Sequence, residues 1–108
     1  MSSGHTFCVL KDVLTHSNGT ELWSAGHVKL FDLVASRLTL HHKGAEVVID
    51  ISLLEPQIFS YGVPYMVLGH VEKSGLSAKV LVRADDLMLE EFIGAALVNQ
   101  DKQATSLM

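Results

Sequence analysis

The sequence predicts a mainly β fold, a single five-stranded barrel followed by one C-terminal α-helix. Apolar and polar residues alternate with the period of a strand in several short segments, and turn-forming residues separate these segments. Helical spacing of the apolar residues appears clearly only after Asp85 and Asp86. A chain of 108 residues, 48% of them hydrophobic, has room for one such domain and enough apolar surface to fold.

Residues 1–20 are predicted to form an arm that plugs one opening of the barrel. Their single apolar segment, from Phe7 to Leu14, has a spacing that suits either a short helix or an extended chain. Asn18-Gly19 is typical of a tight turn and ends the arm. The barrel domain is therefore expected over residues 21–99.

The first two strands are expected between Leu22 and His42, each with one buried face. In the first strand, alternation directs Val28 and Leu30 inward and Lys29 and Phe31 outward. Gly26 suggests a bulge or bend that lets this strand curl around a small barrel. In the second strand, the outward residues are expected to be Arg37, Thr39 and His41.

Three more strands are expected at residues 47–51, 65–71 and 78–83. Lys43-Gly44 and Lys73-Ser74-Gly75 mark turns before and between them, and Leu53 to Pro56 is interpreted as one helical turn that stops before the proline. Five strands with a connection between the third and the fourth is the order of the OB fold.

A helix is predicted over residues 86–99, followed by a flexible tail at 100–108. Asp85 or Asp86 can cap its first turn. Its apolar arc is wider than one core contact needs, and comprises Met88, Leu89, Phe92, Ile93, Ala96 and Leu97. We expect one side to seal the barrel and the other to bind a partner, with a low spot at Gly94-Ala95-Ala96. The alternative is a helix wholly occupied in sealing the barrel.

Composition argues against several functional classes. A net charge of −4 and only eight Lys and Arg residues oppose autonomous tight binding to nucleic acid. Cys8 is the only cysteine, which favours a reducing compartment, and no stretch approaches the roughly 20 apolar residues that span a bilayer. His41 and His42 are adjacent on a strand and point to opposite faces, so no metal site is expected. No catalytic constellation or cofactor-binding loop is present, and we expect a protein that is not an enzyme.

A weak, auxiliary surface for single-stranded DNA is predicted from cations and aromatic rings that could follow a phosphate backbone and stack on bases. Lys79 and Arg83 are expected to share the outward side of the fifth strand. The full set is Lys29, Phe31, Arg37, Tyr61, Tyr65, Lys79 and Arg83. The alternative is a solvated strand face with the tyrosines closing the barrel.

With these elements placed, the chain from about Leu22 to Val98 resembles the smallest subunit of the CST complex. That trimer binds single-stranded telomeric DNA and assists lagging-strand fill-in by DNA polymerase α. The resemblance depends on five blocks in order: Gly26 to Asp32, Ser36 to Leu40, Leu54 to Pro56, Tyr65 to Gly69, and Ala78 to Leu81. One departure is that the predicted helix carries no Lys or Arg, which family members often place near that end.

The resemblance implies a nuclear protein of the telomeric chromosome region whose helix docks on the middle OB-fold subunit of the complex. It also implies association with the large subunit, contact with telomeric single strands mainly through the complex, and an indirect link to DNA polymerase α–primase. Two alternatives remain open. One is the smallest subunit of a replication-protein-A-like complex or another small OB adaptor, and the other is a small ligand-binding barrel or enzyme.

Overall fold

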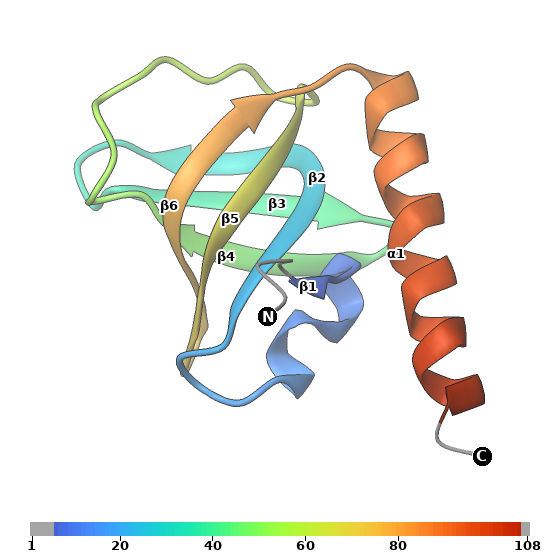
Figure 1. Cartoon of the computed structure of the whole chain (residues 1–108). Coiled ribbons are helices and arrows are strands. Elements are labelled where there is room, and N and C mark those ends of the chain that lie inside the picture. The colour runs from blue at the N-terminus through green and yellow to red at the C-terminus, as the bar shows by residue number, and fades with distance from the viewer. Residues whose placement is uncertain (1–5, 107–108) are drawn as a thin grey trace.

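Five long strands form a ring with a helix beside it (Figure 1). The computed structural model describes residues 6–106, and the side chains of residues 6–96. In chain order the elements are β1 (Thr6–Phe7), the 3-10 helix η1 (Leu10–Thr15), β2 (Glu21–Asp32), β3 (Arg37–His42), β4 (Ala45–Asp50), β5 (Pro64–Glu72), β6 (Gly75–Arg83) and α1 (Asp86–Ser106). Pairing runs β2–β3–β4–β6–β5 and returns from β5 to β2. The predicted OB class, mainly β with a C-terminal helix, is confirmed.

Strand β2 curls because it belongs to both halves of the ring. Its residues 21–27 pair with β5, and its residues 27–32 pair with β3. The register with β3 slips between Val28 and Leu30, which leaves Lys29 as an extra residue. One extra residue in a strand reverses which side chains point inward beyond it. Leu30 is therefore 55% exposed and Phe31 packs against the core, the reverse of the predicted orientations.

Gly26, where a bulge was predicted, is instead a point of close contact. A Cβ atom at this position would lie 2.6 Å from Cδ1 of Leu10 and 3.0 Å from the carbonyl oxygen of His41. A larger residue would force the Leu10 side chain to move and would crowd the His41 carbonyl, so the glycine serves packing. The bulge lies at Lys29, beyond the point where β2 changes its pairing partner.

The N-terminal segment closes the lower opening of the barrel in Figure 1. Cys8, Leu10 and Val13 are all buried in the main core cluster. The backbone N–H of Cys8 donates to the carbonyl of Trp23 over 2.9 Å, and the Ser24 hydroxyl donates to the carbonyl of Cys8 over 2.7 Å. These bonds fix the segment to β2, so its apolar residues form part of the core.

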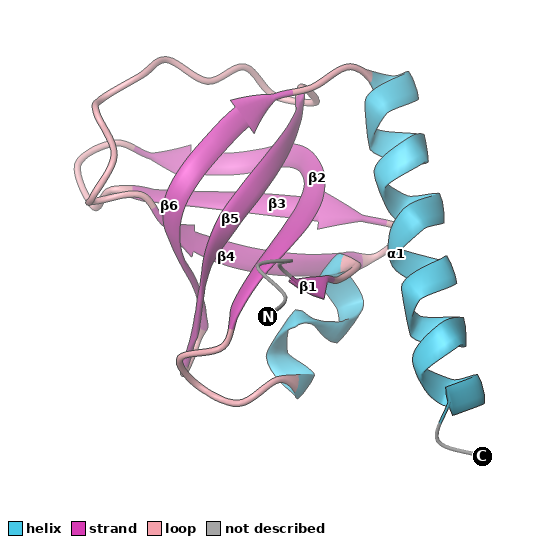
Figure 2. Ribbon diagram, viewed as in Figure 1, coloured by secondary structure: helices cyan, strands magenta, loops and turns pink. Residues whose placement is uncertain are grey.

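The connections follow local backbone chemistry. Lys43 and Gly44 both have positive φ, 48° and 84°, as a two-residue turn between antiparallel strands requires, and the predicted hairpin is confirmed. The predicted helical turn after β4 is a single hydrogen-bonded turn, from Leu54 N–H to the carbonyl of Ile51, and no helix forms in residues 51–63. This loop continues across the upper end of the barrel (Figure 2).

Helix α1 stands beside the barrel and contacts β1, β2 and β5. Its cap is Asp85, whose Oδ1 accepts a hydrogen bond of 2.7 Å from the N–H of Met88. The helix continues to Ser106, beyond the predicted end at residue 99, because no Gly or Pro interrupts residues 99–106. Of the predicted tail, residues 107–108 lie outside the described residues. Within residues 6–106, no helix is both long enough and apolar enough to cross a membrane.

Candidate partner-binding surface

The inner side of α1 is fully occupied by the barrel. Leu89, Phe92 and Ala96 are 2%, 5% and 0% exposed and form a second core cluster with Val9 and Ala25. The Phe92 ring meets the edge of another ring, that of Phe7, at a centroid distance of 5.5 Å. Three of the six residues predicted to bind a partner therefore hold the helix in place in the free chain.

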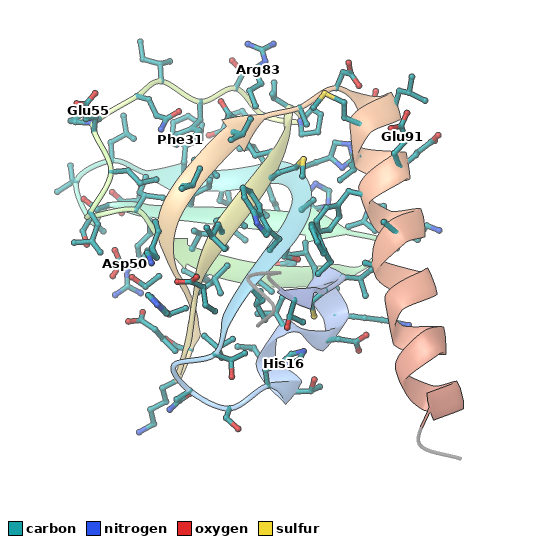
Figure 3. The ribbon with its side chains drawn as sticks, in the orientation of Figure 1. His16, Phe31, Asp50, Glu55, Arg83 and Glu91 are labelled. Atoms are coloured by element: carbon teal, nitrogen blue, oxygen red, sulfur yellow. The ribbon has the colours of Figure 1, made fainter. Side chains whose placement is uncertain are left out.

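The outer side of α1 is uncovered. Leu87 is 64% exposed and Met88 is 43% exposed, while Glu91 points away from the barrel (Figure 3). A Cβ atom at Gly94 would meet no atom within 4 Å, so the helix surface is low and open there. Ala95 is exposed beside it.

The other members of the predicted partner-binding set take different positions. Ala96, the third residue of the predicted low spot, faces the barrel. Ile93 is half-buried on the opposite flank of the helix from Met88. The side chain of Leu97 lies outside the described residues. The described part of the predicted arc therefore divides into a buried inner side and two flanks, one at Met88 and one at Ile93.

A groove of about 290 Å³ runs along one flank of α1, where the helix meets β1 and β5. Of the described residues that line it, only Glu91 is charged, and the set comprises Phe7, Met66, Met88, Glu91, Phe92 and Ala95. A groove with one carboxylate and otherwise apolar walls is suited to an apolar side chain from a second protein.

The apolar surface continues from this groove onto the sheet. Met66 lines the groove and is the direct cross-strand partner of Val82 on β6. In the next pair on the same face, Leu68 on β5 lies opposite Val80 on β6. Cross-strand partners point to the same face of a sheet. Val80 and Val82 are 40% and 41% exposed. We call the whole surface the docking face, and it consists of Met66, Val80, Val82, Leu87, Met88 and Ala95.

Sequence reasoning placed Met88 in the partner-binding arc and Ala95 in the low spot, but it missed Val80 and Val82, because simple alternation along β6 fails. Leu68 pairs with Val80 while Gly69 pairs with Ala78, so Lys79 is an extra residue in β6. Beyond this bulge the valines point outward and Leu81 packs against the core. The signal in the sequence was the uninterrupted apolar run Val80-Leu81-Val82, which is typical of a strand with apolar side chains on both faces.

The same bulge separates the two cations predicted on this strand. Lys79 lies on the outward side. Arg83 is two residues after the inward-pointing Leu81, and its side chain projects from the rim of the barrel (Figure 3). Lys79 and Arg83 therefore do not form one basic stripe.

Carboxylates oppose the other cations of the predicted DNA surface. Nζ of Lys79 lies 2.7 Å from Oε2 of Glu21, and Lys29 forms an ion pair with Glu46. Arg37 has acidic residues as its strand partners on both sides, Asp32 on β2 and Asp50 on β4. Hydrogen bonds from the Ser52 hydroxyl and N–H lower the pKa of Asp50, and Arg37 lowers it further, so this carboxyl is ionised at neutral pH. A DNA phosphate must compete with these carboxylates.

The predicted stacking residues are mostly inside the barrel. Tyr65 is 5% exposed and contacts the ring of Phe59, and Phe31 is half-buried against the same cluster. Tyr61 is 68% exposed, but its ring packs against that of Phe31, with the two ring centroids 5.1 Å apart. Of the three aromatic residues predicted for stacking, only Tyr61 is accessible. This arrangement favours the solvated-face alternative over a single-strand stacking surface.

Three histidines gather where β2 and β3 approach the start of α1. The His27 ring lies 6.1 Å from that of His41 and 6.3 Å from that of His42, and its Nε2 atom is 3.2 Å from Oδ1 of Asp86. Burial lowers the pKa of His42, and the neighbouring Lys43 and histidines lower it further. Across the described part of the chain, no group of three His, Cys, Asp or Glu residues is arranged to hold a metal ion.

Comparison with known proteins gives a family and a fold. The model of a family described as "Telomere-capping, CST complex subunit" matches residues 2–100. A chain of the S. pombe Stn1–Ten1 complex superposes with a TM-score of 0.80 at 14% identity, covering 94% of this chain and 96% of that one. The telomere capping protein Ten1 from Saccharomyces pombe gives 0.78 at 13% identity over 91% and 99%. A structure of yeast Stn1 and Ten1 gives 0.72 at 12% identity over 94% and 75%. No curated protein matches the sequence significantly.

Proposed function

Because the chain belongs to the family of telomere-capping CST complex subunits, we propose that it is the smallest OB-fold subunit of such a complex. Its role is to bind the middle OB-fold subunit, the Stn1-like chain, through the docking face. The role is structural and not enzymatic, and it is exercised in the nucleus at the telomeric end of the chromosome.

The observation that carries this proposal is the docking face itself. Leu87 and Met88 on α1 and Val80 and Val82 on β6 are apolar side chains open to water, and Met66 links the β6 valines to the groove beside α1. Exposed apolar surface of this extent is typical of a protein interface. The open backbone at Gly94 gives a second helix room to approach closely, since interaxial distance depends on side-chain size at the crossing.

The mechanism follows from linkage. A subunit that binds only the folded form of its partner stabilises that form. We infer that this chain stabilises the OB domain of the middle subunit and so raises the affinity of the assembly, including its large subunit, for telomeric single strands. End protection and fill-in by DNA polymerase α–primase then depend on this chain indirectly. The chain itself meets DNA mainly through the complex. The pairing of Lys29 and Lys79 with carboxylates supports this indirect role.

The experiment places a charge in the docking face without disturbing the core. Met88→Glu and Val82→Glu change side chains that are 43% and 41% exposed, so both variants should fold. We expect each to weaken binding to the purified middle subunit by at least about 30-fold, since an interface anchor contributes about 2 kcal/mol or more. Ile58→Glu is the matched control, because Ile58 is 89% exposed on the β4–β5 loop and is not part of the docking face.

Calorimetric titration measures the binding, and circular dichroism checks that each variant is folded. Phe92→Glu is not a suitable test, since Phe92 is 5% exposed and the variant should unfold the isolated chain. If Met88→Glu and Val82→Glu both bind like the unmodified chain, the partner docks elsewhere and the proposal fails.

A further inference from the structure

A second cavity lies on the flank of α1 opposite the docking face. Its volume is about 240 Å³, and among the described residues it shares no lining residue with the groove of the docking face. The start of η1, the β3–β4 turn and α1 all contribute to it. The lining residues are Val9, Leu10, Lys11, His42, Lys43 and Ile93.

The cavity has an apolar floor and a cationic rim. Val9 and Leu10 are 7% and 3% exposed, and half-buried Ile93 completes the floor. Lys11 and Lys43 are exposed at the rim. Within residues 6–96 neither lysine has an ion-pair partner, whereas Lys29 and Lys79 are both paired. A chain of net charge −4 thus keeps two unpaired cations around one apolar depression.

We propose that this cavity binds an acidic peptide segment of a partner protein. One apolar side chain of the segment lies against Val9, Leu10 and Ile93, and flanking carboxylates face Lys11 and Lys43. Complementary charge around an apolar contact steers association and rejects partners of the wrong sign.

Two other ligand classes fit the cavity less well. Its volume is below the roughly 300–1,000 Å³ of most small-molecule pockets, whereas one side chain suits it. None of the described residues that line it is Phe, Tyr or Trp, so these residues offer a nucleic acid base none of the side chains on which single strands usually stack. This proposal depends neither on the family nor on the docking face.

The test is a titration of the isotope-labelled full chain, followed by amide chemical shifts. The probe is the capped hexapeptide Glu-Glu-Leu-Phe-Glu-Glu, compared with Lys-Lys-Leu-Phe-Lys-Lys and Glu-Glu-Ala-Ala-Glu-Glu. We expect only the first peptide to shift the amides of residues 9–11, 42–43 and 93. Lys11→Glu and Lys43→Glu should each lower its affinity at least about tenfold, since each removes a charged hydrogen-bond donor. Lys73→Glu, the same change in another exposed turn, should leave the affinity unchanged.

Several results would overturn the proposal. One is no shift at these amides, and another is shifts confined to the docking face around Met88 and Val82. If Lys73→Glu lowers the affinity as much as Lys43→Glu does, the loss arises from the net charge of the protein and not from the cavity. Tighter binding of oligothymidylate than of the acidic peptide, with shifts at the same amides, would make the cavity a nucleic-acid site instead.

Discussion

Two identical substitutions, Gly75→Ala and Gly94→Ala, should change the stability of the isolated chain in opposite directions. Gly75 lies where β6 pairs with β4 and closes the ring, directly opposite Val48. A Cβ atom at residue 75 would lie 2.0 Å from the carbonyl oxygen of Val48. At Gly94, in the middle of α1, an added Cβ meets no atom within 4 Å.

The magnitude for Gly75→Ala follows from that contact. The added Cβ is fixed to the backbone of residue 75 and the Val48 carbonyl belongs to the backbone, so no side chain can rotate away, and the strands must separate by about 1 Å to reach an ordinary contact. Hydrogen bonds near 2.9 Å would then lie outside the bonding range. Losing two or three backbone bonds of roughly 0.5–1.5 kcal/mol each, together with the packing strain, costs about 2–4 kcal/mol. Gly94→Ala should instead stabilise the chain by up to about 1 kcal/mol, the difference in helix propensity.

Urea denaturation measures both effects. Trp23, the only tryptophan, packs against the cluster beneath α1 and reports unfolding by fluorescence. For a domain of this size, the expected loss in Gly75→Ala lowers the melting temperature by roughly 10–30 °C. If the two variants differ by less than about 1 kcal/mol in free energy of unfolding, the ring does not depend on close backbone approach at Gly75, and our account of barrel closure is refuted.

Two further predictions concern ionisation and DNA. Burial, and secondarily the Asp12 carboxylate, raise the pKa of the Cys8 thiol from 9.0 to about 11. The unfolded thiol therefore ionises first as the pH rises, and up to about 3 kcal/mol of stability is lost between pH 9 and 11. The free energy of unfolding of Cys8→Ala, measured by urea denaturation, should not show this loss. If that free energy falls equally with pH in both proteins, the loss does not come from the buried thiol. The isolated chain should bind telomeric single strands weakly, and Lys29→Ala and Lys79→Ala should change that binding little, because carboxylates already neutralise both lysines. Fluorescence anisotropy tests this, and sub-micromolar binding at physiological salt would disprove it.

Much of the fold was predictable from local signals. Alternation identified the five long strands, Lys43-Gly44 identified the hairpin, and an aspartate ahead of the helical spacing identified the cap, which is Asp85. Each of these signals depends on the backbone conformation and period of a few neighbouring residues. The order and spacing of the sequence blocks also identified the family, because the blocks extend over several elements and not one.

The positions of the candidate site residues were less predictable, because they depend on two bulges. Lys29 and Lys79 are extra residues relative to the strands beside them, and each reverses the orientation of every side chain that follows. Phe31 consequently lies in the core, and Val80 and Val82 lie on the docking face. Alternation within one strand does not specify such a residue, since it is extra only in relation to the register of the strand paired beside it.

The sequence by itself therefore determined which segments become strands and helix, and which family the chain belongs to. Only the tertiary structure decided which side of α1 the barrel covers. Leu89 and Met88 are neighbours with similar apolar character, yet the first is 2% exposed and the second 43%. The difference arises because α1 packs against Ala25 and Phe7, and that contact fixes the rotation of the helix about its own axis.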